Sequence, residues 1–251
     1  MTKIALITGG SRGLGKEMAL SIARKGVDVI VTYNANADEA QKVVSEIEAL
    51  GQKAAALQLS VDSQKGHAEF FIQLQSLLNE KFVGAKVDFW VNNAGIGLPT
   101  TLGHTDESSF DKLMNIHVKS PYFLLQKAIE MMNDGGGIVN IGTGLTRFSM
   151  LGYSVYAAMK SALTTLSQYW ALELGPRKIR VNTVAPGAIA TDFGGGAVRD
   201  NDQINQHIAQ NTALGRVGNA DDIGSVVAFL CTEDSKWING QRIEVSGGVN
   251  I

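Results

Sequence analysis

Short runs of apolar, strand-forming residues alternate with segments of helical periodicity along nearly the whole chain of 251 residues. The apolar runs lie at residues 4–8, 27–32, 54–61, 87–91, 138–141, 179–184 and 242–245. Helical patterns separate them at residues 13–25, 38–50, 66–79, 109–132, 153–174 and 200–231. Because strands joined by helices pair in parallel, this alternation predicts a doubly wound, Rossmann-like α/β fold. We expect seven parallel strands in one sheet, with helices on both of its faces.

The overall composition excludes several classes of protein. The chain contains 22 basic and 24 acidic residues, a net charge of −2, which excludes a protein that binds nucleic acid through a strongly basic surface. No apolar run approaches the ~18 residues of a membrane span, and the run at 4–7 is too short for a signal peptide. We therefore expect a cytoplasmic protein without a membrane partner.

Residues 1–251 are expected to form a single domain, because four prolines and the lack of any charged or low-complexity run offer no linker. The one cysteine lies in an apolar run and is interpreted as a core residue. The histidines do not have the spacing of metal ligands, so no metal site is predicted. They are His67, His104, His117 and His207.

A glycine-rich turn joins the first predicted strand directly to the first predicted helix. Glycines at this place allow the backbone to approach a pyrophosphate, and the start of the helix offers free N–H groups and a positive dipole end. The alternative is an ordinary glycine turn with no ligand. The position between strand and helix favours a dinucleotide site, whose residues would be Gly9, Ser11, Arg12, Gly13, Leu14 and Gly15.

Tyr156 and Lys160 lie one helical turn apart in the long pattern at 153–174, so both side chains project from one face of that helix. A phenol is a poor acid or base at neutral pH, but a neighbouring ammonium group favours the phenolate. We therefore predict an acid/base pair in which Lys160 lowers the pKa of Tyr156.

Several motifs along the chain belong together. The glycine turn has the spacing Gly-x-x-x-Gly-x-Gly, and Asn92-Asn93-Ala94-Gly95, Asn115, Tyr156 with Lys160, and Pro186-Gly187 follow it. Over essentially the whole chain, these motifs resemble the short-chain dehydrogenase/reductase family, in particular its 3-oxoacyl-(acyl-carrier-protein) reductase-like members. The resemblance implies an NAD(P)-dependent oxidoreductase that interconverts a carbonyl and a secondary alcohol. It also implies a homotetramer.

The resemblance assigns roles to individual residues. Tyr156 would be the acid/base, and Lys160 would tune its pKa and bind the ribose. Thr143 stands where the family pattern has serine, and its hydroxyl can still stabilise a substrate oxygen. Asn115 would support a water that relays protons to the lysine. The remaining cofactor-binding residues would be Tyr33, Asn34, Ser60, Val61, Asn92, Ala94, Gly95, Pro186, Gly187, Ile189 and Thr191.

The end of the second predicted strand bears on the choice of cofactor. It carries no acidic residue before Asp38, whereas NAD sites usually place one there to hold the ribose hydroxyls. Arg12, inside the glycine turn, can pair with a 2′-phosphate. The sequence therefore predicts NADP in preference to NAD.

Mostly apolar residues are expected around the substrate. They favour a largely apolar small ketone, and a lid at about 187–215, with mobile glycines at 194–196, is expected to close over it. A 3-oxoacyl thioester on a carrier protein remains an alternative substrate. Arg177 suits the binding of an acidic carrier, although Asp134 does not. A dinucleotide-binding scaffold without turnover stays open as well. The predicted substrate residues are Leu145, Phe148, Met150, Tyr153 and Phe193.

Overall fold

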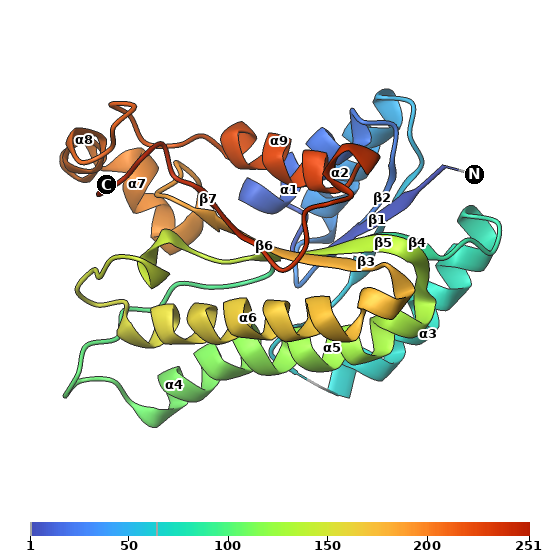
Figure 1. Ribbon diagram of the computed structural model, residues 1–251, viewed down its shortest axis with the longest axis horizontal. Coiled ribbons are helices and arrows are strands. Elements are labelled where there is room, and N and C mark those ends of the chain that lie inside the picture. Colours follow the sequence, from blue (N-terminus) through green and yellow to red (C-terminus); the bar gives the residue numbers. More distant parts are fainter. Residues whose placement is uncertain (1, 64) are drawn as a thin grey trace.

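All seven strands join one parallel sheet, in the order β3-β2-β1-β4-β5-β6-β7. The computed structural model describes residues 2–63 and 65–251. The strands agree with the expected doubly wound fold, and Figure 1 shows them running side by side through the middle of the molecule. Their bounds are β1 (Ile4–Ile7), β2 (Asp28–Tyr33), β3 (Ala54–Gln58), β4 (Val87–Asn92), β5 (Met132–Ile141), β6 (Arg180–Pro186) and β7 (Arg242–Val245).

Helices cover both faces of the sheet (Figure 1). One face carries α1 (Gly13–Ala23), α2 (Ala37–Ala49) and α9 (Ala220–Leu230). The other carries α3 (Lys65–Lys81), α4 (Glu107–Met114), α5 (Ser120–Ala128) and α6 (Ser154–Glu173). Two short helices, α7 (Ala197–Asp200) and α8 (Asp202–Gln210), lie beyond one end of the sheet. None of the described helices combines the length and the apolar character that a membrane crossing requires.

The inner strands are buried because successive side chains enter two different cores, whereas β7 at the edge is half-buried. On β1, Ala5 and Ile7 pack with residues of α1, α2 and α9. Ile4 and Leu6 pack with residues of α3, α5 and α6. The apolar runs in the sequence are therefore continuous rather than alternating, as expected for a sheet with both faces covered.

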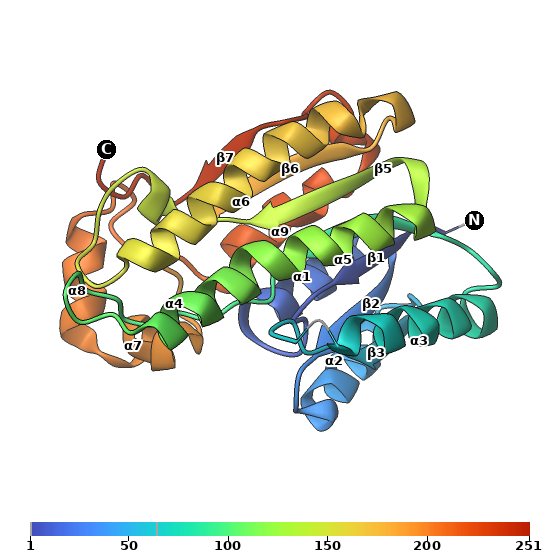
Figure 2. The same ribbon diagram turned by 90° about the horizontal axis from the view of Figure 1, so that it is seen from below.

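The order of the strands reverses between β1 and β4. The chain winds outward from β1 to β3 and then crosses back to pair β4 with the other side of β1. Connections leave in opposite directions at such a point, and ligands bind in the crevice at the carboxyl ends of the strands. Figure 2 shows α7 and α8 at this end of the sheet, near the start of α6.

The segment at 109–132 departs from the expected regular helix. It comprises α4, a π-helical turn over Asn115–Lys119, α5 and a short 3₁₀ turn over Ile129–Met131. β5 also starts at Met132, six residues before the expected start at 138. A β-carbon on Gly136 would lie 2.2 Å from the Asp88 carbonyl oxygen, so only glycine fits beside β4 there. Glycine carries no apolar side chain, so hydropathy does not mark this part of the strand.

Candidate active site

The glycine turn after β1 is closed by contacts that leave no room for side chains. Gly9 and Gly13 have φ angles of +66° and +54°, which glycine adopts readily. A β-carbon on Gly15 would lie 2.1 Å from the Gly9 carbonyl oxygen. Asn93 Nδ2 donates hydrogen bonds to the carbonyl oxygens of Thr8 and Gly9 at 2.9 and 3.0 Å. The turn is thus a preformed cradle of backbone beside the end of β4.

The start of α1 suits an anionic ligand. Arg12 stands at the N-cap position in extended conformation, makes no side-chain capping hydrogen bond, and is exposed. The first turn of α1 contains no acidic residue. Backbone N–H groups at the start of such a helix can bind phosphate oxygens. Thr191 borders the same space, since its Cβ would lie 3.7 Å from a β-carbon on Gly13. The residues present therefore fit the pyrophosphate of a dinucleotide.

The turn that follows β4 is held by buried polar groups. Thr8 Oγ1 accepts hydrogen bonds from the backbone N–H groups of Asn93 and Ala94 at 2.9 and 3.0 Å. Asn92 Nδ2 donates to Asn140 Oδ1 on β5 at 2.7 Å. A β-carbon on Gly95 would lie 2.7 Å from His117 Cε1. The ends of β1, β4 and β5 are thereby locked together at the reversal of the sheet.

The other predicted cofactor residues also follow the carboxyl ends of strands. At the end of β2, Tyr33 is half-buried and Asn34 is exposed, with its carbonyl oxygen accepting from Gln58 Nε2 at 2.9 Å. The strand expected at 54–61 ends at Gln58, which leaves Ser60 and Val61 in a loop. The Ser60 hydroxyl donates to Asp62 at 2.6 Å.

Beyond β6, the chain turns back toward the glycine cradle. A β-carbon on Gly187 would lie 2.9 Å from Ser246 Cα, so glycine allows the end of β6 to pass beside the end of β7. Ile189 then pairs with Gly218, and Thr191 is buried opposite Gly13. Pro186, the last residue of β6, begins this return.

Tyr156 and Lys160 lie on α6 and are both buried, with 6% and 4% of their surfaces exposed. Lys160 Nζ donates to the Ile141 carbonyl oxygen at 2.6 Å and lies 5.8 Å from the centre of the Tyr156 ring. Burial lowers the pKa of Lys160 to about 8. The helical spacing thus brings the two side chains together, as the sequence predicted.

The predicted lowering of the Tyr156 pKa is contradicted by this structure. Burial raises the pKa of the Tyr156 phenol above its ordinary value, and only the side chain of Thr143 acts in the opposite direction. Lys160 Nζ is hydrogen-bonded to Ile141 and lies over the ring, so desolvation of the phenol prevails. A protonated phenol at neutral pH can donate its proton, which suits the reduction of a carbonyl.

Thr143 follows β5 beside Tyr156, on a loop held by β7. Its Oγ1 accepts from the Leu145 N–H at 3.3 Å, and its carbonyl oxygen accepts from Arg242 at 3.2 Å. Glu244 accepts from Arg242 at 2.9 Å and from Arg147 at 3.0 Å. The sequence analysis missed Arg242 and Glu244. Two charged residues at alternate positions of the last strand were the available signal, since they share one face of the sheet.

The structure places His117 next to Tyr156, in the same π-helical turn as the half-buried Asn115, whose support of a water stays a prediction. The rings of His117 and Tyr156 meet edge to face at a centroid distance of 5.2 Å. His117 is buried, and its Nε2 donates to the Ile96 carbonyl oxygen at 2.8 Å. A π-helical turn contains more residues than an α-helical one and changes which side chain faces inward. No regular helical pattern reveals that shift.

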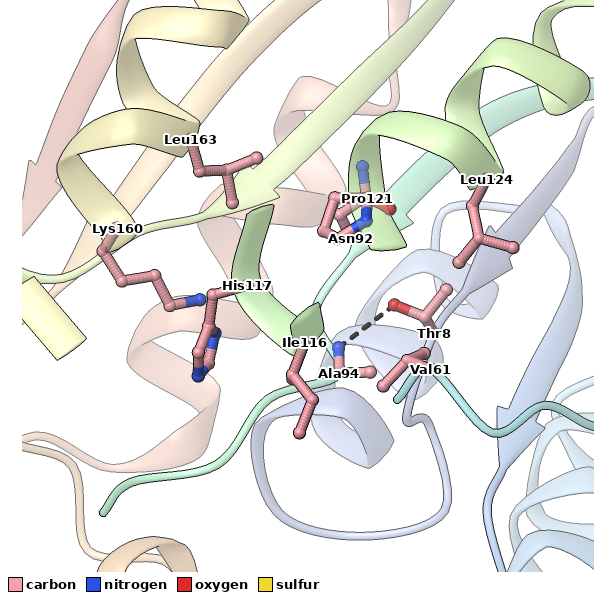
Figure 3. A pocket seen from close by; sticks show the side chains of 10 residues that line it. All are labelled: Thr8, Val61, Asn92, Ala94, Ile116, His117, Pro121, Leu124, Lys160 and Leu163. Carbon is pink, nitrogen blue, oxygen red and sulfur yellow. Dashed lines mark hydrogen bonds between the residues drawn. The ribbon is translucent and has the colours of Figure 1, made fainter. Parts of the chain in front are cut away.

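His117 and Lys160 line a small cavity of about 10 Å³ (Figure 3). In Figure 3 the side chain of Lys160 extends toward His117, and a dashed line joins Thr8 to the backbone of Ala94. Asn115 is not among the lining residues. They are Thr8, Val61, Asn92, Ala94, Ile116, His117, Pro121, Leu124, Lys160 and Leu163.

A group of mostly apolar side chains, called the apolar wall below, also lies around Tyr156. The rings of Tyr153 and Phe193 lie 6.2 and 5.9 Å from the Tyr156 ring. Leu145 belongs to the same cluster, together with two residues that the sequence analysis missed, Ile96 and Leu98. Of the other predicted residues, Phe148 packs beside Gly144 and under Arg147, and Met150 is exposed, so their contact with a substrate stays a prediction.

The expected lid begins with a compact turn. Gly194, Gly195 and Gly196 all have positive φ angles, and an Arg199 ion pair with Asp192 spans the turn. The tip of the Phe193 ring faces Gly97, where a β-carbon would lie 2.9 Å from Phe193 Cζ. Movement of this segment on ligand binding stays a prediction.

Comparisons with known proteins agree with this geometry. A model of the family described as "Enoyl-(Acyl carrier protein) reductase" matches residues 9–250. The short-chain dehydrogenase/reductase FrzI of Cladobotryum sp is 36% identical, over 99% of this chain and 96% of its own.

Two solved structures extend the likeness. LugOII, described as a promiscuous reductase that catalyses keto-reduction at C1 during lugdunomycin biosynthesis, superposes with a TM-score of 0.92 at 37% identity, over 98% of this chain and 96% of its own. The landomycin C-6 ketoreductase LanV, solved with bound NADP and rabelomycin, gives a TM-score of 0.90 at 34% identity, over 99% of this chain and 96% of its own.

Proposed function

The chain belongs to the short-chain dehydrogenase/reductase family, and from that premise we propose that it uses NADPH to reduce a largely apolar ketone to a secondary alcohol. It is an oxidoreductase that acts on carbonyl and alcohol groups. One observation carries the proposal. A buried Tyr156, with Lys160 on one side and Thr143 near its phenol, faces an apolar wall beside the glycine cradle.

Each residue of the site has a distinct part in this reaction. NADPH supplies a hydride to the carbonyl carbon when it is bound. Tyr156, whose phenol is protonated at neutral pH, donates its proton to the carbonyl oxygen. The Thr143 hydroxyl donates a hydrogen bond to the same oxygen as negative charge develops on it. Lys160 supplies positive charge beside the phenolate that remains.

Two features support NADPH over NADH. The end of β2 carries no acidic side chain, and Asp38 lies exposed in the first turn of α2. Arg12 is exposed at the start of α1, where its guanidinium can pair with a 2′-phosphate. The binding of NADP by LanV, which is 34% identical, agrees with this choice.

The surroundings of Tyr156 support an apolar ketone over the alternative of a carrier-bound thioester. Phe193, Tyr153 and Leu145 offer an aryl or alkyl substituent a matching surface. Arg177, which suited an acidic carrier, instead pairs with Asp134 at 2.7 Å. Both residues lie at the amino ends of β5 and β6, at the opposite end of these strands from Tyr156.

A steady-state screen tests the proposal. Aryl and alkyl ketones, polyhydroxy ketones and 3-oxoacyl thioesters would each be supplied with NADPH and with NADH, and the loss of nicotinamide absorbance recorded. We expect the highest kcat/KM for an apolar ketone with NADPH. A preference for 3-oxoacyl thioesters would support the carrier alternative, and tight NADPH binding without any turnover would contradict the proposed reaction.

A further inference from the structure

His117 has a buried nitrogen for which the reaction described so far gives no task. Its side chain is only 1% exposed, and Nε2 already donates to the Ile96 carbonyl oxygen. Because a carbonyl only accepts, Nε2 carries the proton and Nδ1 of the neutral ring is an acceptor. Within the described part of the chain, Nδ1 has no hydrogen-bond partner. Such an acceptor is costly to bury unless something donates to it.

The cavity beside His117 can supply the donor. Its volume of about 10 Å³ corresponds to one water molecule, and its lining includes the polar side chains of Thr8, Asn92 and Lys160. Lys160 Nζ has three hydrogens, of which one is donated to the Ile141 carbonyl oxygen. No direct hydrogen bond joins Lys160 to His117 among residues 2–63 and 65–251. A single water between them would satisfy a donor of Lys160 and the acceptor of His117.

We propose that His117 is a positioning residue for Lys160, because its Nδ1 binds a water molecule that also accepts a hydrogen bond from the Lys160 ammonium group. This inference rests on the proposed function, in which Lys160 acts on Tyr156. The water keeps Lys160 Nζ between Ile141 and Tyr156 and replaces part of the solvation that burial removes. His117 itself stays neutral and donates no proton to the reaction. Its role is to orient the water through the δ position of its ring.

Two substitutions, His117→Asn and His117→Gln, separate the roles of the two ring nitrogens. An asparagine amide places an acceptor at the level of Nδ1 but does not reach Ile96. A glutamine amide reaches the level of Nε2 and can still donate to Ile96, but it leaves the δ position without an acceptor. The two variants therefore form a matched pair of nearly equal polarity.

The experiment measures kcat, the KM of the ketone and the dissociation constant of NADPH for the wild type and both variants. We expect kcat of His117→Asn within about threefold of the wild type, and kcat of His117→Gln at least about tenfold lower, as for a buried group that loses its partner. The KM and the NADPH affinity should change little. The opposite order would show that the bond to Ile96 matters and would overturn the proposal, as would equal kcat values in all three proteins.

Nitrogen-15 NMR of the wild-type histidines provides a second test that does not depend on the stability of the variants or on ketone turnover. We expect the Nδ1 resonance of His117 to show an unprotonated, hydrogen-bonded nitrogen, and to move when Lys160→Met removes the ammonium group. A protonated Nδ1, or an Nδ1 that does not respond to Lys160→Met, would overturn the proposal. If the wild type reduces no ketone, the proposed function fails, while this spectrum still decides the role of His117.

Discussion

The two sides of the candidate active site differ in how firmly the fold holds them. The floor, which consists of Tyr156, Lys160 and His117, is at most 6% exposed and is contributed by α6 and the π-helical turn. The rim, which consists of the predicted substrate residues Met150 and Phe193, is 46% and 45% exposed. Floor side chains have partners on several elements, whereas rim side chains lie on loops with few neighbours. The proposed function thus assigns the chemistry to the core and the choice of substrate to the surface.

This difference separates the expected effects of substitutions. Loss of the Tyr156 proton or of the Lys160 charge removes a group that every substrate needs, so it lowers turnover of all of them. A change in the rim alters the contacts of one substituent and leaves the reacting groups in place. Under the proposed function, substitutions of Met150 or Phe193 should therefore change substrate choice at little cost to the stability of the fold.

The largest effect is expected for Tyr156→Phe. The substitution keeps the ring that packs against His117 and Phe193 but removes the transferable proton, and general acid catalysis contributes about 10²–10⁴-fold. Turnover should fall by about that factor for every ketone, with NADPH affinity retained. Tyr169→Phe is the matched control, because Tyr169 lies on the same helix and is 62% exposed. More than a tenth of wild-type turnover in Tyr156→Phe would remove Tyr156 from its assigned role.

A stability measurement tests the burial of the floor directly. Burial of the ring, and to a smaller extent the positive charge of Lys160, lowers the pKa of His117 to about 3. The unfolded chain, with an ordinary histidine pKa near 6.5, then binds more protons between pH 3 and 6.5, so stability falls as the pH drops through that window. From pH 7 to pH 5 the loss from His117 should be about 2 kcal/mol, or about 25-fold in the unfolding equilibrium.

Urea unfolding at the two pH values measures this loss. His117→Asn should lack the His117 contribution, while the exposed His207→Asn should behave like the wild type. The pKa of His67 is also lowered by burial, and this contribution is common to all three proteins. An identical loss in His117→Asn and the wild type would mean that His117 is not buried as a neutral ring.

Arg12 lies outside both regions and should affect the cofactor alone. Arg12→Ala removes a guanidinium that is exposed beside the glycine cradle, so the KM for NADPH should rise about tenfold while that for NADH changes little. Arg24→Ala is the control, because Arg24 follows α1 and pairs with Glu17 at 2.7 Å. Equal changes for the two cofactors would show that Arg12 does not contact the 2′-phosphate.

The smallest effect is expected at the rim. Phe193→Ala should shift the ratio of kcat/KM between an aryl ketone and a small alkyl ketone by about fivefold, because only the larger substituent reaches the ring. Gly97→Ala should shift the same ratio without removing the ring, since its β-carbon would lie 2.9 Å from Phe193 Cζ. An unchanged ranking of ketones in both variants would contradict the distinction between floor and rim.

Much of the fold and part of the site could be predicted from local patterns in the sequence. Strand and helix periodicity located all seven strands, and the spacing of Tyr156 and Lys160 placed both on one face of α6. The glycines of the first turn predicted a close approach of backbone segments, and the structure has such close contacts at Gly9 and Gly15. These features depend on residues a few positions apart, so a single stretch of sequence contains the whole signal.

The remaining features of the site depend on contacts between distant parts of the chain. A π-helical turn brought His117 to the cavity that Lys160 lines. Arg242 reached the carbonyl of Thr143 from the last strand. The direction of the pKa shift at Tyr156 followed from the burial of its phenol by residues distant in sequence. Local spacing in the chain therefore settles which elements form and which side chains share a helix face. The solvation of those side chains and the identity of their neighbours depend on the packing of the folded chain around them. Local spacing in the sequence contains no signal for that packing.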